Sequence, residues 1–149
     1  MKKKQTVSHY VEWLSAHELH QDSKEWLSEL EFIEDEHLFF EDLIISFTPQ
    51  LMNPNKFSDY QKTVDRVGIS KKRNRSFIEK IKKHKKNLKI MVDGVDQLEE
   101  EDAYTKTHRE LIVEVNDFLS DFRTLKRHLF SIFTRIKKSE KQKRLIDKS

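Results

Sequence analysis

The stretch that decides the fold spans residues 104–136 and reads YTKTHRELIVEVNDFLSDFRTLKRHLFSIFTRI. Large apolar or aromatic residues and one histidine recur in it at steps of four and three: Tyr104, His108, Leu111, Val115, Phe118, Phe122, Leu125, Leu129, Ile132 and Ile136. Because an α-helix turns once in about 3.6 residues, all of these side chains lie on one face. The average spacing is typical of coiled-coil seams, so the stretch predicts a long helix that packs against other helices.

A second stripe of the same kind lies nearer the N-terminus, at Trp26, Leu30, Ile33, His37, Phe40, Ile44 and Phe47. Both stripes are too long for β-strands, and the rest of each helix circumference is too polar for a membrane span. Only 2 Gly and 2 Pro occur in 149 residues, which disfavours any fold that needs many turns. We therefore expect an all-α protein.

Turn and capping residues divide the chain into three long predicted helices. Asp22 and Glu25 form a capping box before a first helix over 23–48, which is expected to end near Phe47 because prolines and asparagines mark 48–56 as a loop. A second helix is predicted over 57–92, and a third follows the Asp93-Gly94 stop over 97–138. Residues 1–22 form an N-terminal arm or short helix, and 139–149 a frayed basic tail.

One interruption stands inside the second predicted helix. Residues 70–76 read SKKRNRS and contain nothing apolar, and Gly68 lies just upstream. A break at 68–76 is therefore possible, although a continuous helix with a polar patch is the favoured prediction. Three long helices joined by short loops run antiparallel to their neighbours. The expectation is a single domain over 1–149, an elongated, coiled-coil-like antiparallel three-helix bundle with a short extra N-terminal helix.

Composition limits the compartment and the chemistry. The sequence has no cysteine, which excludes disulfides, thiolate metal ligands and cysteine nucleophiles, and favours the reducing cytoplasm. No apolar core of a signal peptide follows the first residues, and no run of about 20 apolar residues is present, so we expect no membrane partner.

Charge is strongly segregated along the chain. Nine acidic residues and one basic residue lie between Asp22 and Asp42, whereas ten basic residues and one acidic residue lie between Ser70 and Ile90. Ten further basic residues lie from Arg123 to Ser149. In antiparallel helices the acidic stretch comes level with both basic stretches, so we interpret the blocks first as complementarity between helices, and second as a surface for nucleic acid or an acidic partner.

The stretch WLSELEF at 26–32, followed by Glu36 and Phe40, resembles a family of small uncharacterised bacterial helical proteins. In that family Trp-x-x-x-Leu-x-Phe opens the first long helix. The resemblance covers residues 23–44. It implies a helical bundle, and it implies no activity, cofactor or site residues.

Two patterns could hold a metal. Glu34-x-x-His37 resembles the ligand pair of di-iron carboxylate bundles, and Glu41 could add an oxygen, but no second Glu-x-x-His occurs. His17-x-x-His20 has a spacing that suits two imidazole ligands. We regard Glu34 and His37 as weak metal candidates, and expect a seam histidine to be a hydrogen-bonded core residue. No cofactor is predicted.

The densest basic cluster is the candidate site for an anion or an acidic partner: Lys71, Lys72, Arg73 and Arg75. It lacks exposed aromatic residues for base stacking and the spacing of a helix-turn-helix, so sequence-specific nucleic-acid binding is disfavoured.

Signatures of catalysis are missing from the sequence. There is no glycine-rich phosphate loop, no Gly-x-Ser-x-Gly and no His-Glu-x-x-His. We therefore predict a protein that is not an enzyme, a cytoplasmic helical-bundle scaffold or protein–protein interaction module that binds a protein partner or itself. The alternatives are electrostatic binding of nucleic acid or an acidic partner through the second helix and the C-terminal tail, and a metal-binding helical bundle.

Overall fold

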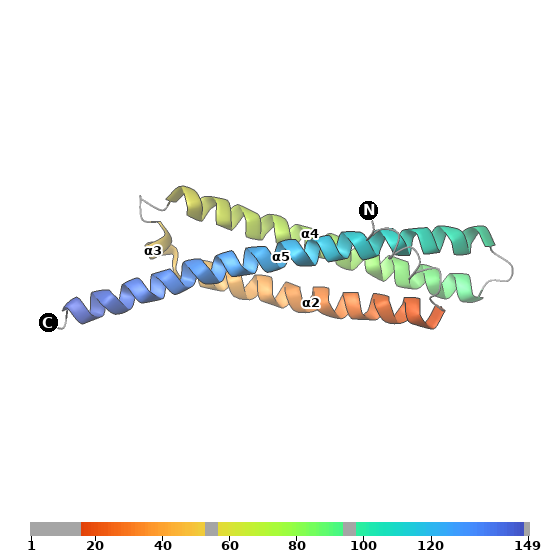
Figure 1. Ribbon diagram of the computed structural model, residues 1–149, viewed down its shortest axis with the longest axis horizontal. Coiled ribbons are helices and arrows are strands. Elements are labelled where there is room, and N and C mark those ends of the chain that lie inside the picture. Colours follow the sequence, from red (N-terminus) through yellow and green to blue (C-terminus); the bar gives the residue numbers. More distant parts are fainter. Residues whose placement is uncertain (1–15, 53–56, 94–97, 148–149) are drawn as a thin grey trace, which may run out of the picture. The chain divides into compact units, whose positions relative to one another are not determined.

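The computed structural model describes residues 16–52, 57–93 and 98–147, with side chains described throughout except at 57–59, 91–93 and 98–100. These residues form four helices and no strand: α2 (Ala16–Ser46), α3 (Thr48–Leu51), α4 (Phe57–Asp93) and α5 (Leu98–Asp147) (Figure 1). The predicted all-α class is confirmed. Within the described ranges no helix is both long and apolar enough to cross a membrane.

Helix α2 begins at Ala16, well before the start expected at residue 23. The predicted N-cap, Asp22, is wrong because this residue lies inside the helix, where its carboxylate accepts a hydrogen bond from His108. Residues 16–22 of the predicted N-terminal arm therefore belong to α2. The rest of the predicted short N-terminal helix, up to residue 15, lies outside the described residues.

The predicted loop at 48–56 contains one helical turn, α3. Pro49 stands in its first turn, where a missing N–H costs nothing because that group has no intrahelical acceptor. The Thr48 hydroxyl donates a hydrogen bond to the Ile44 carbonyl at 2.8 Å, and the Leu51 N–H donates to the Phe47 carbonyl at 2.9 Å. The first bond links α3 to the last turn of α2, and the second closes the single turn of α3. Residues 53–56 lie outside the description.

Helix α4 runs without interruption through 68–76, so the possible break there does not occur. Helix α5 continues to Asp147, nine residues past the expected end at Lys138. The expected end at Lys138 is wrong because the sequence that follows, SEKQKRLID, contains no glycine or proline and is rich in strong helix formers.

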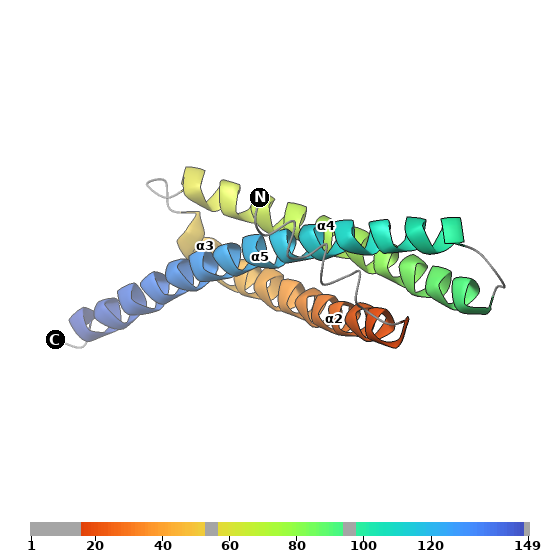
Figure 2. The same ribbon diagram turned by 45° about the vertical axis from the view of Figure 1, so that its right-hand side comes forward.

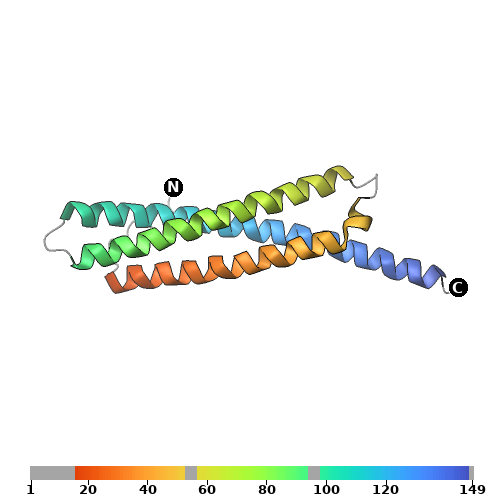
Figure 3. The ribbon, with the colours of Figure 1, turned by 180° about the vertical axis from the view of Figure 1, so that it is seen from behind.

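The chain divides into two compact units, and each long helix contributes a segment to both. Unit 1 comprises Met1–Glu34 and Arg73–Leu119, and unit 2 comprises Asp35–Lys72 and Ser120–Ser149. In unit 1 the second half of α4 lies beside the first half of α5 (Figures 1 and 3), and the Phe77 and Phe118 rings meet at 5.4 Å.

In unit 2 the second half of α2 lies beside the middle of α5 (Figure 2), where the ring of Phe40 meets that of Phe130 at 5.6 Å and Phe47 stacks on Phe133 at 5.5 Å. The two stripes seen in the sequence supply half of the buried side chains of the described residues. Only Trp26, Phe47 and Ile132 among the stripe residues are partly exposed. The stripes therefore predicted the buried faces of α2 and α5 correctly.

Candidate functional site

The buried face of α4 carries polar side chains at half of its positions. It follows the same steps of four and three as the stripes of α2 and α5: Thr63, Val67, Ser70, Asn74, Phe77, Ile81, His84 and Leu88, all of them buried. We call its four polar members, Thr63, Ser70, Asn74 and His84, the polar seam. Burying a polar group costs free energy unless it forms a hydrogen bond. Each member of the seam has a hydrogen-bond partner on another helix.

In unit 1 the polar seam joins a three-residue hydrogen-bonded chain, Asp22–His108–His84. The Asp22 carboxylate lies 3.1 Å from Nε2 of His108, and Nδ1 of His108 lies 2.9 Å from Nε2 of His84. A carboxylate only accepts hydrogen bonds, so Nε2 of a neutral His108 carries the proton and its Nδ1 is the acceptor. Nε2 of His84 must then be the donor. This hydrogen-bonded chain therefore places the proton of each neutral imidazole on Nε2.

Aromatic rings enclose these two histidines. Tyr104 stacks on His84 with ring centres 4.0 Å apart and planes 5° from parallel, and Trp26 packs on His108 at 4.8 Å. Both histidines are almost fully buried. The result is an apolar enclosure around a polar chain, in which an added positive charge is poorly solvated.

Burial sets the ionisation of the enclosed groups. It lowers the pKa of His84 to about 4, with a smaller contribution from the neighbouring His108. It also lowers the pKa of His108, although the hydrogen bond and charge of Asp22 act in the opposite direction. Burial raises the pKa of Tyr104 to about 12. At neutral pH the imidazoles are uncharged, so this site acts as a neutral hydrogen-bonded layer inside the core.

A cavity of about 380 Å³ adjoins His84 in the same unit. The residues around it are mostly charged or polar: Lys80, Lys83, His84, Asn87, Thr107, Glu110, Leu111 and Glu114. Lys80 and Glu114 form an ion pair across it at 3.9 Å, with both side chains about half exposed. Opposite charges therefore compensate each other within this cavity.

The remaining members of the polar seam bond in the same way. In unit 1 the Asn74 amide donates to the Leu30 carbonyl at 2.9 Å. In unit 2 the Ser70 hydroxyl lies 2.9 Å from Nε2 of His37, and the Thr63 hydroxyl lies 3.3 Å from Nε2 of His128. The polar positions of α4 are thus matched by carbonyl or imidazole partners on α2 and α5.

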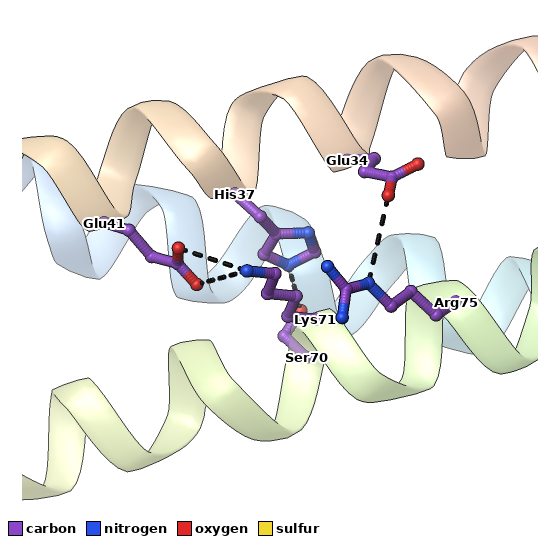
Figure 4. A network of polar contacts seen from close by, with 6 residues as sticks. All are labelled: Glu34, His37, Glu41, Ser70, Lys71 and Arg75. Carbon is purple, nitrogen blue, oxygen red and sulfur yellow. Dashed lines mark hydrogen bonds and ion pairs between the residues drawn. The ribbon is translucent and has the colours of Figure 1, made fainter.

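The two weak metal candidates have other partners. In unit 2, His37 is fully buried and forms a hydrogen bond with Ser70 (Figure 4). Its ring also makes an edge contact with the Phe122 ring at 5.1 Å. In unit 1, Glu34 faces Arg75, with 3.9 Å between its oxygen and the Arg75 Nε (Figure 4). Across the described ranges no group of three or more His, Asp or Glu residues could hold a metal.

The candidate anion-binding cluster is only partly open to solvent. Lys71 in unit 2 holds both oxygens of Glu41, at 2.9 and 3.1 Å, and in unit 1 Arg75 pairs with Glu34 (Figure 4). The Arg73 guanidinium lies 5.1 Å from the centre of the Phe118 ring. Lys72 is exposed. The structure therefore assigns most of this cluster to contacts within the chain.

The pairs follow the charge blocks of the sequence. Acidic residues of α2 meet basic residues of α4, and in unit 2 Glu36 also binds Lys126 of α5 at 2.8 Å. These side chains remain partly exposed, so each pair stabilises the fold by only about 0–1 kcal/mol. Their main effect is to favour one pairing of helices over others.

Sequence reasoning missed the polar seam. Thr63, Ser70, Asn74 and His84 are polar and so do not stand out in a search for apolar periodicity. The signal was nonetheless present, because they fill the steps between Val67, Phe77, Ile81 and Leu88. His108 and Tyr104 were recognised as stripe residues, but their contact with His84 depends on how α4 and α5 align.

No protein-family model matches the chain, and neither the curated proteins nor the solved structures give a match.

Proposed function

We propose that the protein is a non-catalytic cytoplasmic interaction module that associates with a second copy of itself through an apolar patch on unit 2. The patch consists of Phe39 and Leu43 on α2 with Phe130 on α5. Phe39 is 53% and Phe130 49% exposed, and Leu43 is partly buried. Exposed aromatic side chains of this size are enriched at protein interfaces and supply much of their binding free energy.

The patch continues the core of unit 2 outward. The buried ring of Phe40 is contacted by Phe39 at 5.8 Å and by Phe130 at 5.6 Å, so the two exposed rings flank one fully packed ring. A patch that rests on a packed ring keeps its shape when a partner binds, which reduces the entropy lost on association.

Charges on either side of the patch favour a second copy as the partner. On α2, Asp35 and Asp42 lie four residues before and three residues after Phe39, and both are exposed. On α5, Arg123 and Arg127 precede Phe130 by seven and three residues. In a two-fold dimer the same patch serves both copies, so α2 of one copy would face α5 of the other and acidic residues would oppose basic ones.

The finer arrangement of helices is part of the same proposal: the three long helices form an antiparallel three-helix bundle. The order of contacts inside each unit supports it. In unit 1, Phe77, Lys80 and His84 of α4 meet residues of falling number on α5, namely Phe118, Glu114 and His108. In unit 2, Glu36 and Phe40 of α2 and Phe47 just after it meet residues of rising number on α5, namely Lys126, Phe130 and Phe133. Falling numbers indicate antiparallel neighbours and rising numbers indicate parallel ones, as expected for the first and third helices of such a bundle. The polar seam would hold that alignment, since sliding α4 along its neighbours separates each polar side chain from its partner.

The electrostatic and metal-binding alternatives have less support. Lys71 and Arg75 of the basic cluster bond to carboxylates of the same chain, and Arg73 lies over an aromatic ring. His37 is fully buried, bonds to a serine hydroxyl and packs against the Phe122 ring. These contacts within the chain are the reason for preferring self-association.

Sedimentation equilibrium over a wide range of protein concentration tests the proposal. The wild-type mass should rise to that of a dimer, whereas the Phe39→Ser/Phe130→Ser variant should stay monomeric and keep a helical circular dichroism spectrum. The control Ile69→Ser/Leu145→Ser removes two other exposed apolar side chains of unit 2 and should still dimerise. A wild-type protein that is monomeric throughout, or a control that dissociates equally, would contradict the proposal.

A charge exchange tests the identity of the partner. Asp42→Arg alone should weaken the dimer by placing like charges across the interface, and Arg127→Asp in the same chain should restore it. Absence of this rescue would exclude the two-fold pairing of α2 with α5.

A further inference from the structure

A second cavity of unit 1 lies between the first turns of α2 and the last turns of α4, with a volume of about 450 Å³. It is lined by Ala16, His17 and His20 from α2 and by Lys85, Lys86, Leu88 and Lys89 from α4. Its size falls within the range of cavities that bind small molecules. It belongs to a different unit from the apolar patch proposed above for self-association.

The lining of this cavity is one-sided in charge. Three lysines and two histidines contribute to it, and no carboxylate is among the seven described residues that form it. This differs from the cavity beside His84, where Glu110 and Glu114 face Lys80 and Lys83. Lysines and histidines that line the same cavity give it a positive potential, which a bound anion would lower.

The floor of the cavity is apolar. Leu88 is buried and packs in one apolar cluster with Leu19, Tyr104 and Ile112, with Trp26 against it. Ala16 adds a methyl group on the side of α2, and the aliphatic stems of the lysines cover further apolar surface. The cavity therefore combines an apolar floor with a cationic rim.

This composition disfavours the metal site that the His17-x-x-His20 spacing suggested. Two imidazoles beside three ammonium groups would place a cation next to positive charge, and no carboxylate in the lining offsets it. The same groups suit a phosphoryl oxyanion, because lysine ammonium groups and imidazole N–H groups donate hydrogen bonds to its oxygens.

We propose that the cavity lined by His17, His20, Lys85, Lys86 and Lys89 binds a small organic phosphate, with the phosphoryl group at the cationic rim and the apolar part on Leu88. The ligand must carry both parts, since inorganic phosphate leaves the floor uncovered and a neutral apolar molecule leaves the rim without a counter-charge.

Phenyl phosphate is a suitable probe, and its binding to the full chain can be followed through the ring signals of His17 and His20 by NMR. It should bind at least about threefold more tightly than inorganic phosphate, because the phenyl group removes apolar surface of the floor from water. Phenol should not bind measurably. Raising the salt concentration should weaken the binding of phenyl phosphate.

A matched pair of variants separates the cavity from the general basicity of α4. Lys86→Glu/Lys89→Glu changes two exposed lysines of the cavity and should lower the affinity by tenfold or more. Lys72→Glu/Lys82→Glu makes the same change of charge at two exposed lysines of α4 outside the cavity, and should keep the affinity within about twofold. His17→Asn/His20→Asn should also weaken binding, and circular dichroism establishes that each variant is folded.

Three results would overturn the proposal. The first is an equal loss of affinity in both pairs of lysine variants, which would indicate non-specific attraction to a basic helix. The second is tight binding of Zn²⁺ at His17 and His20 without any binding of phenyl phosphate, and the third is no change in the histidine signals at millimolar phenyl phosphate.

Discussion

Acidification should destabilise this protein through His84, and the size of the effect follows from its burial. The enclosed ring has a pKa of about 4, whereas a histidine in the unfolded chain has its ordinary value of 6.5. Below pH 6.5 the unfolded chain therefore binds a proton at this residue that the folded chain does not bind. The free energy of unfolding must fall as the pH falls from about 6.5 to about 4.

The magnitude can be worked out from this difference. Each unit of pKa corresponds to about 1.4 kcal/mol, so His84 alone lowers the free energy of unfolding by about 2 kcal/mol at pH 5 and by about 3 kcal/mol near pH 4. His108 acts in the same direction, because burial lowers its pKa as well. A loss of 2 kcal/mol is a large fraction of the stability of an ordinary domain.

Urea denaturation followed by circular dichroism at pH 7.5 and pH 5 measures the effect. The His84→Gln variant keeps a polar side chain but does not titrate, so its loss of stability between these pH values should be smaller than that of the wild type by about 2 kcal/mol. The control is His17→Gln, which removes an exposed histidine of the same unit and should leave the pH dependence of the wild type unchanged.

Burial of His84 is not the cause of the acid sensitivity if wild type and His84→Gln lose the same stability between pH 7.5 and pH 5. The same conclusion holds if His17→Gln reduces the pH dependence as much as His84→Gln, because an exposed ring experiences no comparable burial.

Three further substitutions test the packing, the helix interior and the ion pairs. Phe118→Ala should lower the free energy of unfolding by about 3–5 kcal/mol in urea denaturation, because the ring is fully buried, whereas Lys83→Ala should change it by less than about 0.5 kcal/mol. Gly68→Ala should raise the melting temperature, with a gain of about 0.5–1 kcal/mol, since the position is inside α4 and an added methyl group meets nothing within 4 Å; a lower melting temperature would argue against a continuous helix there. Lys71→Glu should destabilise by about 1 kcal/mol at low salt and less at high salt, because it places a second carboxylate beside Glu41. The control Lys72→Glu, at an exposed position, should have little effect on stability at either salt concentration.

The parts of the fold that could be predicted are those encoded by apolar periodicity. Phe40, Val115 and Phe118 were placed in the core from spacing alone, and each is buried. Residues 16–22 were placed outside the first long helix because Asp22 resembles an N-cap. The local pattern could not reveal that its carboxylate instead bonds to His108, which lies 86 residues away in the chain.

The polar contacts of the core were not predictable for a related reason. Asn74 and Ser70 lie in a run without apolar residues, and only the alignment of α4 with α2 provides them with a carbonyl and an imidazole. In the sequence, His84 is flanked by lysines and resembles a surface residue. Only its partner on another helix shows that it belongs to the core. Periodicity fixes which face of a helix is buried, but pairing between helices depends on loop lengths and side-chain fit.

The distances along the chain between paired residues favour one order of folding over others. His84 and His108 are 24 residues apart, and Lys71 and Glu41 are 30 residues apart. The pairs Asp22–His108 and Glu36–Lys126 close much longer loops, of 86 and 90 residues. Shorter loops cost less entropy to close, so α4 should meet its sequence neighbours before α2 meets α5. Helix α4 is a member of both early contacts, and its mean hydropathy is the lowest of the three long helices. We therefore expect α4, a helix of low hydropathy with regularly spaced hydrogen-bonding groups, to form contacts early in folding. Substitutions in its buried face should then slow folding more than substitutions elsewhere that cost the same stability.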